Sequence, residues 1–326
     1  MLSTESSPPA ERESDPPAGA SARPTVPRVL VLLAAHNGAP WIRKQVESIL
    51  AQESVEVQLI VRDDGSTDET RAELDRFSRR ITVVADGSPT GSAAGNFLTL
   101  IRENSAAGAG FVAFADQDDL WDTDKLRRAC DTLSTQHAAG YSSATIAEWE
   151  DGRRVLLEPG VQTRSDYLLE GAGQGCTFVL TAELYERVRR LLTQRRDLTD
   201  GLHYHDWATY ALARAWGLRW SFDPQPSVHY RQHAGNDTGA RGTVGGVVKR
   251  FALIRRGWYR KQVLAIAELC YAAAPANTTV AAWRSVLRQP GRWRKRWQIA
   301  GFCLRGGRRR LQDNATLILA ALAGWI

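Results

Sequence analysis

The chain has 326 residues, of which 43% are hydrophobic and 24% are charged, as in ordinary globular proteins. This length and composition exclude collagen-like, coiled-coil and wholly disordered chains, and leave room for about two compact units. Four cysteines are scattered without a C-x-x-C pair, so neither a disulfide framework nor a zinc knuckle is expected. No apolar run reaches the roughly 18 residues that a membrane-spanning helix needs.

Charge is distributed unevenly along the chain, although the net charge is only +6. Residues 1–150 carry 14 Lys and Arg against 23 Asp and Glu, and residues 241–326 carry 17 against 2. An acidic front and a basic tail predict different partners, with an anionic partner for the tail. Residues 1–27 are rich in Pro, Ser and Glu, which predicts a disordered tail. This tail lacks the cationic start and apolar stretch of a secretory signal, so we expect a cytoplasmic protein.

Strand and helix patterns alternate four times before residue 136. The short apolar or alternating runs that predict strands are 28–35, 55–61, 81–85 and 111–115. The helices are expected at about 40–50, 68–79, 92–103 and from 124 onward. This order is typical of βαβ units and predicts an α/β protein with a mainly parallel, helix-covered sheet. In such sheets ligands bind beyond the carboxyl ends of the strands.

The second half of the chain is less regular. Strands are predicted at 145–148, 153–157, 176–181, 218–222 and 227–231. A glycine-rich loop precedes the third of these strands, and helices are expected at 182–193 and 205–216. After Gly246 the pattern predicts helices only.

Two acidic clusters follow predicted strands. Asp116 and Asp118 lie one residue apart just past 111–115, where two carboxylates can share one hard divalent cation. Such a cation neutralises the charge that builds on a diphosphate leaving group. A bare D-x-D is also common in polar turns, but the buried strand before it favours a site. Asp63 and Asp64 end the second strand, where carboxylates can accept hydrogen bonds from a nucleobase or ribose, whereas Asp68 is expected to cap a helix.

Residues 29 to about 239 resemble the family 2 glycosyltransferases, which have the GT-A fold, and most closely their rhamnosyltransferase-like branch. Seven ordered segments carry the resemblance: Ala34-Ala35-His36-Asn37-Gly38, Asp63-Asp64-Gly65-Ser66-x-Asp68, Gly91-x-x-x-Gly95-Asn96-Phe97, Ala115-Asp116-Gln117-Asp118-Asp119-x-Trp121, Gly175-Cys176-Thr177-Phe178, His205-Asp206-Trp207 and Tyr230-Arg231-Gln232-His233-x-Gly235-Asn236. The tail lacks both a Q-x-x-R-W motif and membrane-spanning helices, so a processive polysaccharide synthase is not expected.

The resemblance implies a role for each matched position. The donor nucleotide would be bound by Ala35, Asn37, Asp63 or Asp64, Asn96, Asp116 and Gln117. The Mg²⁺ or Mn²⁺ ion would be held by Asp116 and Asp118, and His233 would add a metal or phosphate contact unless it is a hydrogen-bonded loop histidine. The sugar and acceptor would be bordered by Trp121, Trp207 and His205. Asp206 would be the catalytic base, although an acidic residue here also suits a helix N-terminus.

The implied activity is an inverting, metal-dependent transfer of one sugar from a nucleotide-diphosphate donor. By branch similarity the donor is dTDP-rhamnose or a related sugar nucleotide, and the acceptor a saccharide or lipid-linked glycan of the cell envelope. An acceptor-side base and a clamp on the leaving group meet the needs of such a transfer. The competing hypothesis is a non-catalytic nucleotide-binding scaffold that the basic tail recruits to membrane or nucleic acid.

Residues 241–326 are expected to form a helical extension beyond a tail of 1–27 and a catalytic domain of 28–240. It has three basic runs, 255–261, 292–297 and 308–310, and Trp is interleaved with Arg in the first two. That pattern favours peripheral contact with anionic lipid at the inner face of the cell membrane. Nucleic acid is the less favoured anionic partner, and a solvated helical face with inward-packed Trp is the structural alternative.

Overall fold

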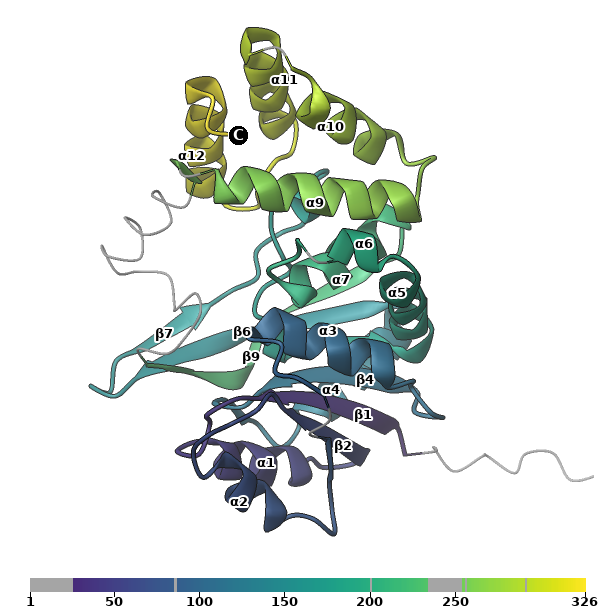
Figure 1. Cartoon of the computed structure of the whole chain (residues 1–326), viewed down its shortest axis with the longest axis vertical. Helices are drawn as coiled ribbons and strands as arrows, with labels where there is room; N and C mark the ends of the chain where they lie inside the picture. The colour runs from purple at the N-terminus through teal and green to yellow at the C-terminus, as the bar shows by residue number, and fades with distance from the viewer. Residues whose placement is uncertain (1–25, 85–86, 200, 234–253, 256, 291) are drawn as a thin grey trace, which may run out of the picture.

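The structure is a computed structural model that describes residues 26–84, 87–199, 201–233, 254–255, 257–290 and 292–326. Residues 1–25 of the predicted tail and the predicted domain boundary at 240 lie outside the described residues. Figure 1 shows the sheet with its covering helices at one end of the molecule and the C-terminal helices at the other.

The first half of the chain forms the predicted βαβ units. Its elements are β1 (Arg28–Ala35), α1 (Ile42–Leu50), β2 (Glu56–Asp63), α2 (Thr70–Asp75), β3 (Thr82–Val84), α3 (Ala93–Glu103), β4 (Phe111–Asp116), β5 (Leu120–Trp121) and α4 (Lys125–Thr135). Strands β3, β2, β1 and β4 lie side by side and parallel. The carboxyl ends of β1, β2 and β4 therefore meet at one edge, where Ala35 is level with Asp63 and Ala34 with Asp116.

The second half of the chain extends the sheet with strands of mixed direction. Its elements are β6 (Gly140–Trp149), β7 (Arg154–Leu157), the 3-10 turns η1 (Asp166–Leu168) and η2 (Gly175–Thr177), β8 (Val179–Thr181), α5 (Ala182–Gln194), α6 (Arg196–Thr199), α7 (His205–Ala215) and β9 (Trp220–Gln232). The order in the sheet is β3-β2-β1-β4-β8-β6-β9-β5, with β7 paired to β6. Strand β8 is antiparallel to β4 and β6, whereas β9 runs parallel to β6.

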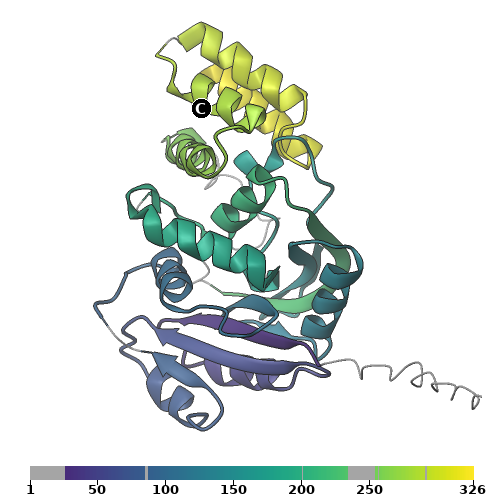
Figure 2. The same ribbon diagram turned by 90° about the vertical axis from the view of Figure 1, so that its right-hand side faces the viewer.

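Helices cover both faces of this sheet, as Figures 1 and 2 show. Leu30 and Leu32 of β1 pack among buried residues of α3, α5 and α7. Val31 and Leu33, which point to the other face, pack with α1, α2 and α4. The alternation explains why β1 is almost continuously apolar, because both of its faces are buried.

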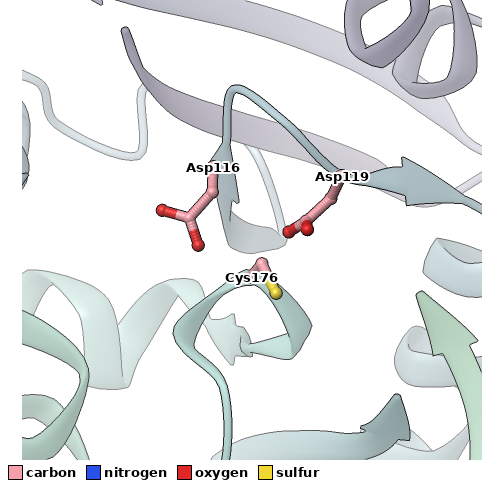
Figure 3. Close-up of side chains that lie close together, drawn as sticks. All are labelled: Asp116, Asp119 and Cys176. Carbon is pink, nitrogen blue, oxygen red and sulfur yellow. The ribbon is translucent and has the colours of Figure 1, made fainter. Parts of the chain in front are cut away.

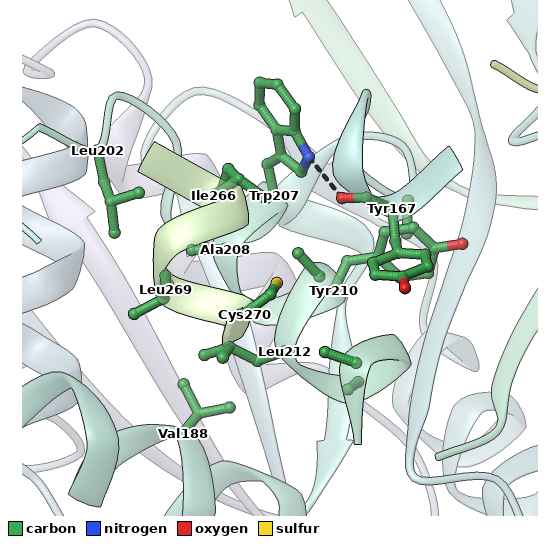
Figure 4. Packing of buried hydrophobic residues seen from close by; sticks show 14 of the residues in the cluster. Tyr167, Val188, Leu202, Trp207, Ala208, Tyr210, Leu212, Ile266, Leu269 and Cys270 are labelled. Atoms are coloured by element: carbon green, nitrogen blue, oxygen red, sulfur yellow. Dashed lines mark hydrogen bonds between the residues drawn. The ribbon is translucent and has the colours of Figure 1, made fainter. Parts of the chain in front are cut away.

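The structure describes four helices at the C-terminal end beyond residue 257: α9 (Trp258–Ala273), α10 (Thr278–Arg288), α11 (Arg292–Leu304) and α12 (Leu311–Ala323). Their buried side chains belong to the same hydrophobic cluster as α3, α5 and α7, so the extension packs directly on the helices that cover one face of the sheet. Figure 4 shows Ile266, Leu269 and Cys270 of α9 lying against side chains of α7. No helix in the described part of the chain combines the length and the apolar character needed to cross a bilayer.

Several predicted elements have different bounds in the structure. The predicted strands 218–222 and 227–231 form one strand, β9, that continues through Pro224 and Pro226 with shifts of register against β6. The predicted strand 176–181 begins instead with the 3-10 turn η2, and the helix expected over 68–79 is limited to α2. The helical prediction for the C-terminal extension is confirmed for the described residues.

Candidate active site

Gln117 joins the ends of β1 and β4 at the carboxyl edge of the sheet. Its side chain accepts a hydrogen bond from the His36 N–H at 2.8 Å and donates one to the His36 carbonyl at 2.9 Å. Gly38 leaves room for this side chain, because a Cβ at that position would lie 2.2 Å from Gln117 Oε1 and would displace it. Gln117 therefore joins the loops that follow β1 and β4, next to the predicted site.

A buried polar network fixes the end of β2. The Asp64 carboxylate accepts hydrogen bonds from Arg62 Nη1 at 2.5 Å, the Thr90 N–H at 2.8 Å and the Gly91 N–H at 3.1 Å. Burial raises the pKa of Asp64, but hydrogen bonds from Thr90 and Arg62 outweigh that effect and lower it. Asn96 donates to the carbonyls of Ala35 and Arg62 and accepts from Arg62 Nη1. The network therefore holds Asp64 as a carboxylate.

Neighbouring loop residues shape the same edge. Asp63 Oδ1 accepts from the N–H and the hydroxyl of Ser66, which closes the turn after β2. Asn37 has a positive φ of 48° and accepts from the Thr67 N–H at 2.8 Å. Asp68 accepts from the Thr70 N–H, the first of α2, at 3.0 Å, although Glu69 and not Asp68 occupies the N-cap position. The predicted donor-binding residues are thus brought together, with side chains that also hold the loops in place.

Asp118 and His233 meet at this edge from distant parts of the chain. His233 Nε2 lies 2.7 Å from Asp118 Oδ2, and the imidazole stacks on Trp41 with ring centroids 4.1 Å apart. No site role was predicted for Trp41, since one aromatic residue before a helix carries no signal of a partner 192 positions later. Carboxylate oxygens of Asp116 and Asp118 suit Mg²⁺ or Mn²⁺, and an imidazole nitrogen is an acceptable further ligand for Mn²⁺.

A second set of donor atoms lies behind the first. Asp116, Asp119 and Cys176 place one ligand atom each within 4.8 Å of one another. Figure 3 shows these three side chains close together. Burial, reinforced by the neighbouring Asp118, raises the pKa of Asp119 to about 8, and burial also raises the pKa of the Cys176 thiol. A protonated acid and a thiol are poor ligands for a hard cation, although a bound cation would itself lower both pKa values. Asp116 belongs both to this set and to the predicted pair of Asp116 and Asp118, which stays a prediction.

Asp206 lies in the first turn of α7, next to η2. A Cβ at Gly175 would lie 3.0 Å from the Asp206 Cβ, so the two backbones are in close approach. The following residue, Cys176, is the one whose sulfur neighbours Asp116. Asp206 is thus on the same side of the molecule as the Asp116 cluster, separated from it by one short turn.

The environment of Asp206 suits a general base. Burial raises its pKa to about 6, and hydrogen bonds from the backbone of Trp207 and Gly175 only partly offset the rise. The Trp207 N–H donates to Oδ1 at 2.7 Å. A carboxylate with this pKa is ionised at pH 7 but is a stronger base than an exposed aspartate.

The three side chains expected to border the sugar are buried in the structure. Trp121 and Trp207 are 4% and 5% exposed, and His205 is 8% exposed. Lys125 Nζ lies 3.6 Å from the ring centroid of Trp121, and Trp207 Nε1 donates to the Tyr167 carbonyl (Figure 4). Both indoles therefore pack in the core, and their contact with the sugar stays a prediction.

His205 packs as an apolar side chain. Its ring stacks on Phe97 at 3.7 Å between centroids and meets Phe114 edge-on. Burial lowers its pKa to about 3, so the imidazole is neutral at physiological pH. His205 therefore has a packing role in the core next to Asp206, and its contact with the acceptor stays a prediction.

The Arg308-Arg309-Arg310 run binds the protein itself. Arg309, only 6% exposed, reaches Asp166 Oδ2 at 3.0 Å and the Pro159 carbonyl at 2.7 Å, and also donates to the Gly171 carbonyl. Arg308 pairs with Glu170 at 3.2 Å. This arrangement, called the arginine clamp below, corrects the expectation that all three guanidinium groups face lipid. It joins the C-terminal extension to residues 158–171, just before η2.

Asp166 is the buried centre of the clamp. Besides Arg309 it accepts from the Tyr210 hydroxyl at 2.7 Å and from Arg214 Nη1 at 3.1 Å. Both partners lie on α7, the helix that carries Asp206 in its first turn. Sequence reasoning missed this network, because its members are 44 to 143 residues apart.

Comparison with known proteins agrees with this geometry. Residues 30–198 match the sequence profile described as glycosyl transferase family 2, which is more than half of the chain. The chain belongs to glycosyltransferase family 2. It is 35% identical over 240 residues to a dTDP-rhamnosyl transferase, RfbG, of Shigella flexneri, which covers 72% of this chain and 83% of that protein. It is also 28% identical over 237 residues to the succinoglycan biosynthesis protein ExoO of Rhizobium meliloti, over 65% of this chain and 62% of the relative.

Solved structures confirm the fold of this family 2 enzyme. Residues 1–349 of TarS from S. aureus superpose with a TM-score of 0.54 at 15% identity, over 91% of this chain and 80% of that one. A crystal structure of the same TarS segment in complex with UDP gives the same TM-score at 14% identity, over 91% and 89% of the two chains. The chain therefore has the GT-A fold, with a mixed sheet and C-terminal helices.

Proposed function

We propose that this family 2 glycosyltransferase is an inverting, metal-dependent enzyme that transfers rhamnose or a similar sugar from a dTDP-linked donor. The closeness of Asp116 and Asp206 to consecutive residues of η2 supports the proposal, because the Cys176 sulfur lies beside Asp116 and Gly175 lies against Asp206, while Asp118 follows Asp116 by two residues. The 35% identity to a dTDP-rhamnosyl transferase supports the choice of donor. The acceptor is a saccharide or lipid-linked glycan of the cell envelope, in keeping with the relative in succinoglycan biosynthesis.

The mechanism divides its tasks among this chain's carboxylates. Held by Asp116 and Asp118, with His233 as a further ligand, Mg²⁺ or Mn²⁺ would neutralise charge on the departing nucleoside diphosphate. Asp206 accepts the proton of the acceptor hydroxyl at its carboxylate as that hydroxyl attacks the anomeric carbon. The attack comes from the face opposite the leaving group, so the configuration inverts without a covalent enzyme intermediate.

The donor nucleoside is proposed to lie over the ends of β1 and β2. Asp64, held ionised by its network, offers carboxylate oxygens to a base N–H or a ribose hydroxyl, and Asp63 is the alternative. Ala35 and Asn37 line the base pocket, with Asn96 and Gln117 holding its walls. The pyrophosphate would then reach Asp116.

Contact with an anionic membrane through residues 241–326 is the other part of the proposal. It would put the enzyme at the inner face of the cell membrane, beside a lipid-linked acceptor. The extension's 17 cations against 2 acidic residues support an anionic partner.

The test is nucleotide release from a panel of sugar nucleotides, with Mn²⁺, with Mg²⁺ and with chelator. We expect dTDP release from dTDP-rhamnose that requires the ion. D206N should lower turnover about 10²–10⁴-fold while donor affinity stays the same, because only the base is lost. D197N, at an exposed carboxylate in α6, is the matched control and should retain full turnover. Donor binding without release under any condition would favour the scaffold alternative instead.

A further inference from the structure

The outer faces of α11 and α12 leave large apolar side chains in solvent. On α11, Trp293, Trp297 and Leu304 are 72%, 65% and 73% exposed. On α12, Leu311 and Leu319 are 87% and 68% exposed. Their spacings of four, seven and eight residues put each set on one side of its helix. Clustered exposure of this kind marks an interaction surface, since scattered single residues would need no explanation.

The two helices are fixed in the orientation that exposes these stripes. Ile299 and Cys303 of α11 and Leu317 and Ala321 of α12 are buried on the inner side. Lys295 is also turned inward, where its amine donates to the Leu287 carbonyl at 2.7 Å. The arginine clamp holds the connection between the two helices. The inner side of the two helices is therefore covered by the protein itself. Among the described residues, nothing covers the large apolar side chains of the outer side, so a partner can bind there.

Cations flank the apolar stripe of α11. Arg294 and Arg305 are exposed, and together with Trp297, Gln298, Gly301 and Phe302 they line a hollow of about 470 Å³. Asp313 is the single acidic residue in 292–326, and it is half-buried. Arg308 and Arg309 do not add to this surface, because they are bound in the clamp.

We propose that the outer faces of α11 and α12 dock on an anionic lipid bilayer, with Trp293 and Trp297 at headgroup depth and Arg294 and Arg305 on lipid phosphates. The proposal specifies which surface makes the membrane contact of the proposed function. It rests on that function only in placing the enzyme beside a lipid-linked acceptor, and it does not depend on catalysis. Indole rings favour the bilayer interface, and cations beside an apolar stripe are typical of helices lying in that plane. A second copy would bring its own arginines against these, and nucleic acid would leave the leucines unburied.

Flotation with vesicles tests the docking face. The full chain is mixed with phosphatidylcholine vesicles or with equimolar phosphatidylglycerol and phosphatidylcholine, at low and high salt. We expect binding only with phosphatidylglycerol. W293S/W297S should abolish it, and R294S/R305S should weaken partitioning about 30-fold, at about fivefold per cation. V161S and R43S/R71S change equally exposed residues elsewhere and should bind as the unaltered chain does.

Other outcomes overturn the proposal. Equal binding to neutral vesicles, or unchanged binding by W293S/W297S with an unaltered melting temperature, would refute docking by this face. So would a dimer that W293S/W297S dissociates, or a nucleic-acid gel shift that it abolishes. Nucleotide release in solution by the same variants separates the two proposals. If the chain floats with the vesicles but releases nucleotide from no donor, the docking face is supported and the proposed glycosyltransfer is refuted.

Discussion

Replacing Arg309 with Met tests whether the C-terminal extension supports the active site. R309M keeps the length and apolar stem of the side chain but removes the guanidinium of the arginine clamp. Lost with it are the Asp166 contact at 3.0 Å, the Pro159 carbonyl contact at 2.7 Å and the bond to the Gly171 carbonyl. Asp166 is completely buried, so its carboxylate cannot turn to solvent for compensation.

The expected loss of stability follows from these contacts. Removing one partner of a buried ion pair costs roughly 3–5 kcal/mol. Asp166 keeps Tyr210 and Arg214, which favours the lower end, about 3 kcal/mol. Because the unfolding entropy is about 2.1 cal/mol/K per residue, a folded unit of this size shifts by about 1.6 °C per kcal/mol, and the melting temperature should fall by about 5 °C.

The adjacent residue provides the control. Arg310 is exposed and makes one bond, to the Glu158 carbonyl at 3.2 Å, so R310M should change stability by less than about 0.5 kcal/mol. Thermal unfolding followed by circular dichroism compares the two variants. Under conditions where R309M is folded, its kcat should fall while its donor affinity stays unchanged, because the clamped segment leads to Gly175 and Asp206. Identical melting of R309M and R310M would show that the clamp contributes nothing.

Three further predictions concern the site itself. D118A should lose the Mn²⁺-dependent part of dTDP binding measured by calorimetry, and equal affinity with and without the ion in the unaltered chain would contradict the metal assignment. Because burial raises the pKa of Asp206 to about 6, the base is ionised above that pH, and kcat should fall about tenfold per pH unit below pH 6. A kcat that stays constant down to pH 4.5 would show that Asp206 is not the base. G175A should lower kcat at least tenfold with donor affinity retained, since its Cβ would lie 3.0 Å from that of Asp206. G201A is the control, because a Cβ there meets nothing within 4 Å, and equal turnover of the two variants would refute the close approach.

The central sheet could be predicted from the sequence because its signals are local. An uninterrupted apolar run such as β1 needs no knowledge of its neighbours to predict a strand buried on both faces. Acidic residues at the ends of β2 and β4 then follow from the rule that parallel strands end at one edge. The prediction of two separate strands, 218–222 and 227–231, was wrong, because the structure has the single strand β9 there. Pro224 and Pro226 between them are typical of a loop, but in β9 they lie beside a register shift, which tolerates missing N–H groups.

The roles of individual side chains were harder to predict. Trp207 and His205 flank Asp206 in sequence, but helix geometry turns both into the core while Asp206 remains half-buried. Three consecutive arginines are typical of a solvated surface, and their partners Asp166 and Glu170 lie about 140 residues earlier. Contacts at that separation leave no periodic signal in one sequence, so only the folded chain identifies them.

All four cysteines are free thiols shielded from solvent, and this makes the chain a convenient background for site-directed labelling. Burial raises the pKa of Cys130 and Cys303 to about 12, and it raises the pKa of Cys176 and Cys270 as well. Native sulfur should therefore stay unmodified by maleimide dyes at neutral pH. L304C would add one outward-facing attachment point for a fluorophore without any prior removal of native cysteines.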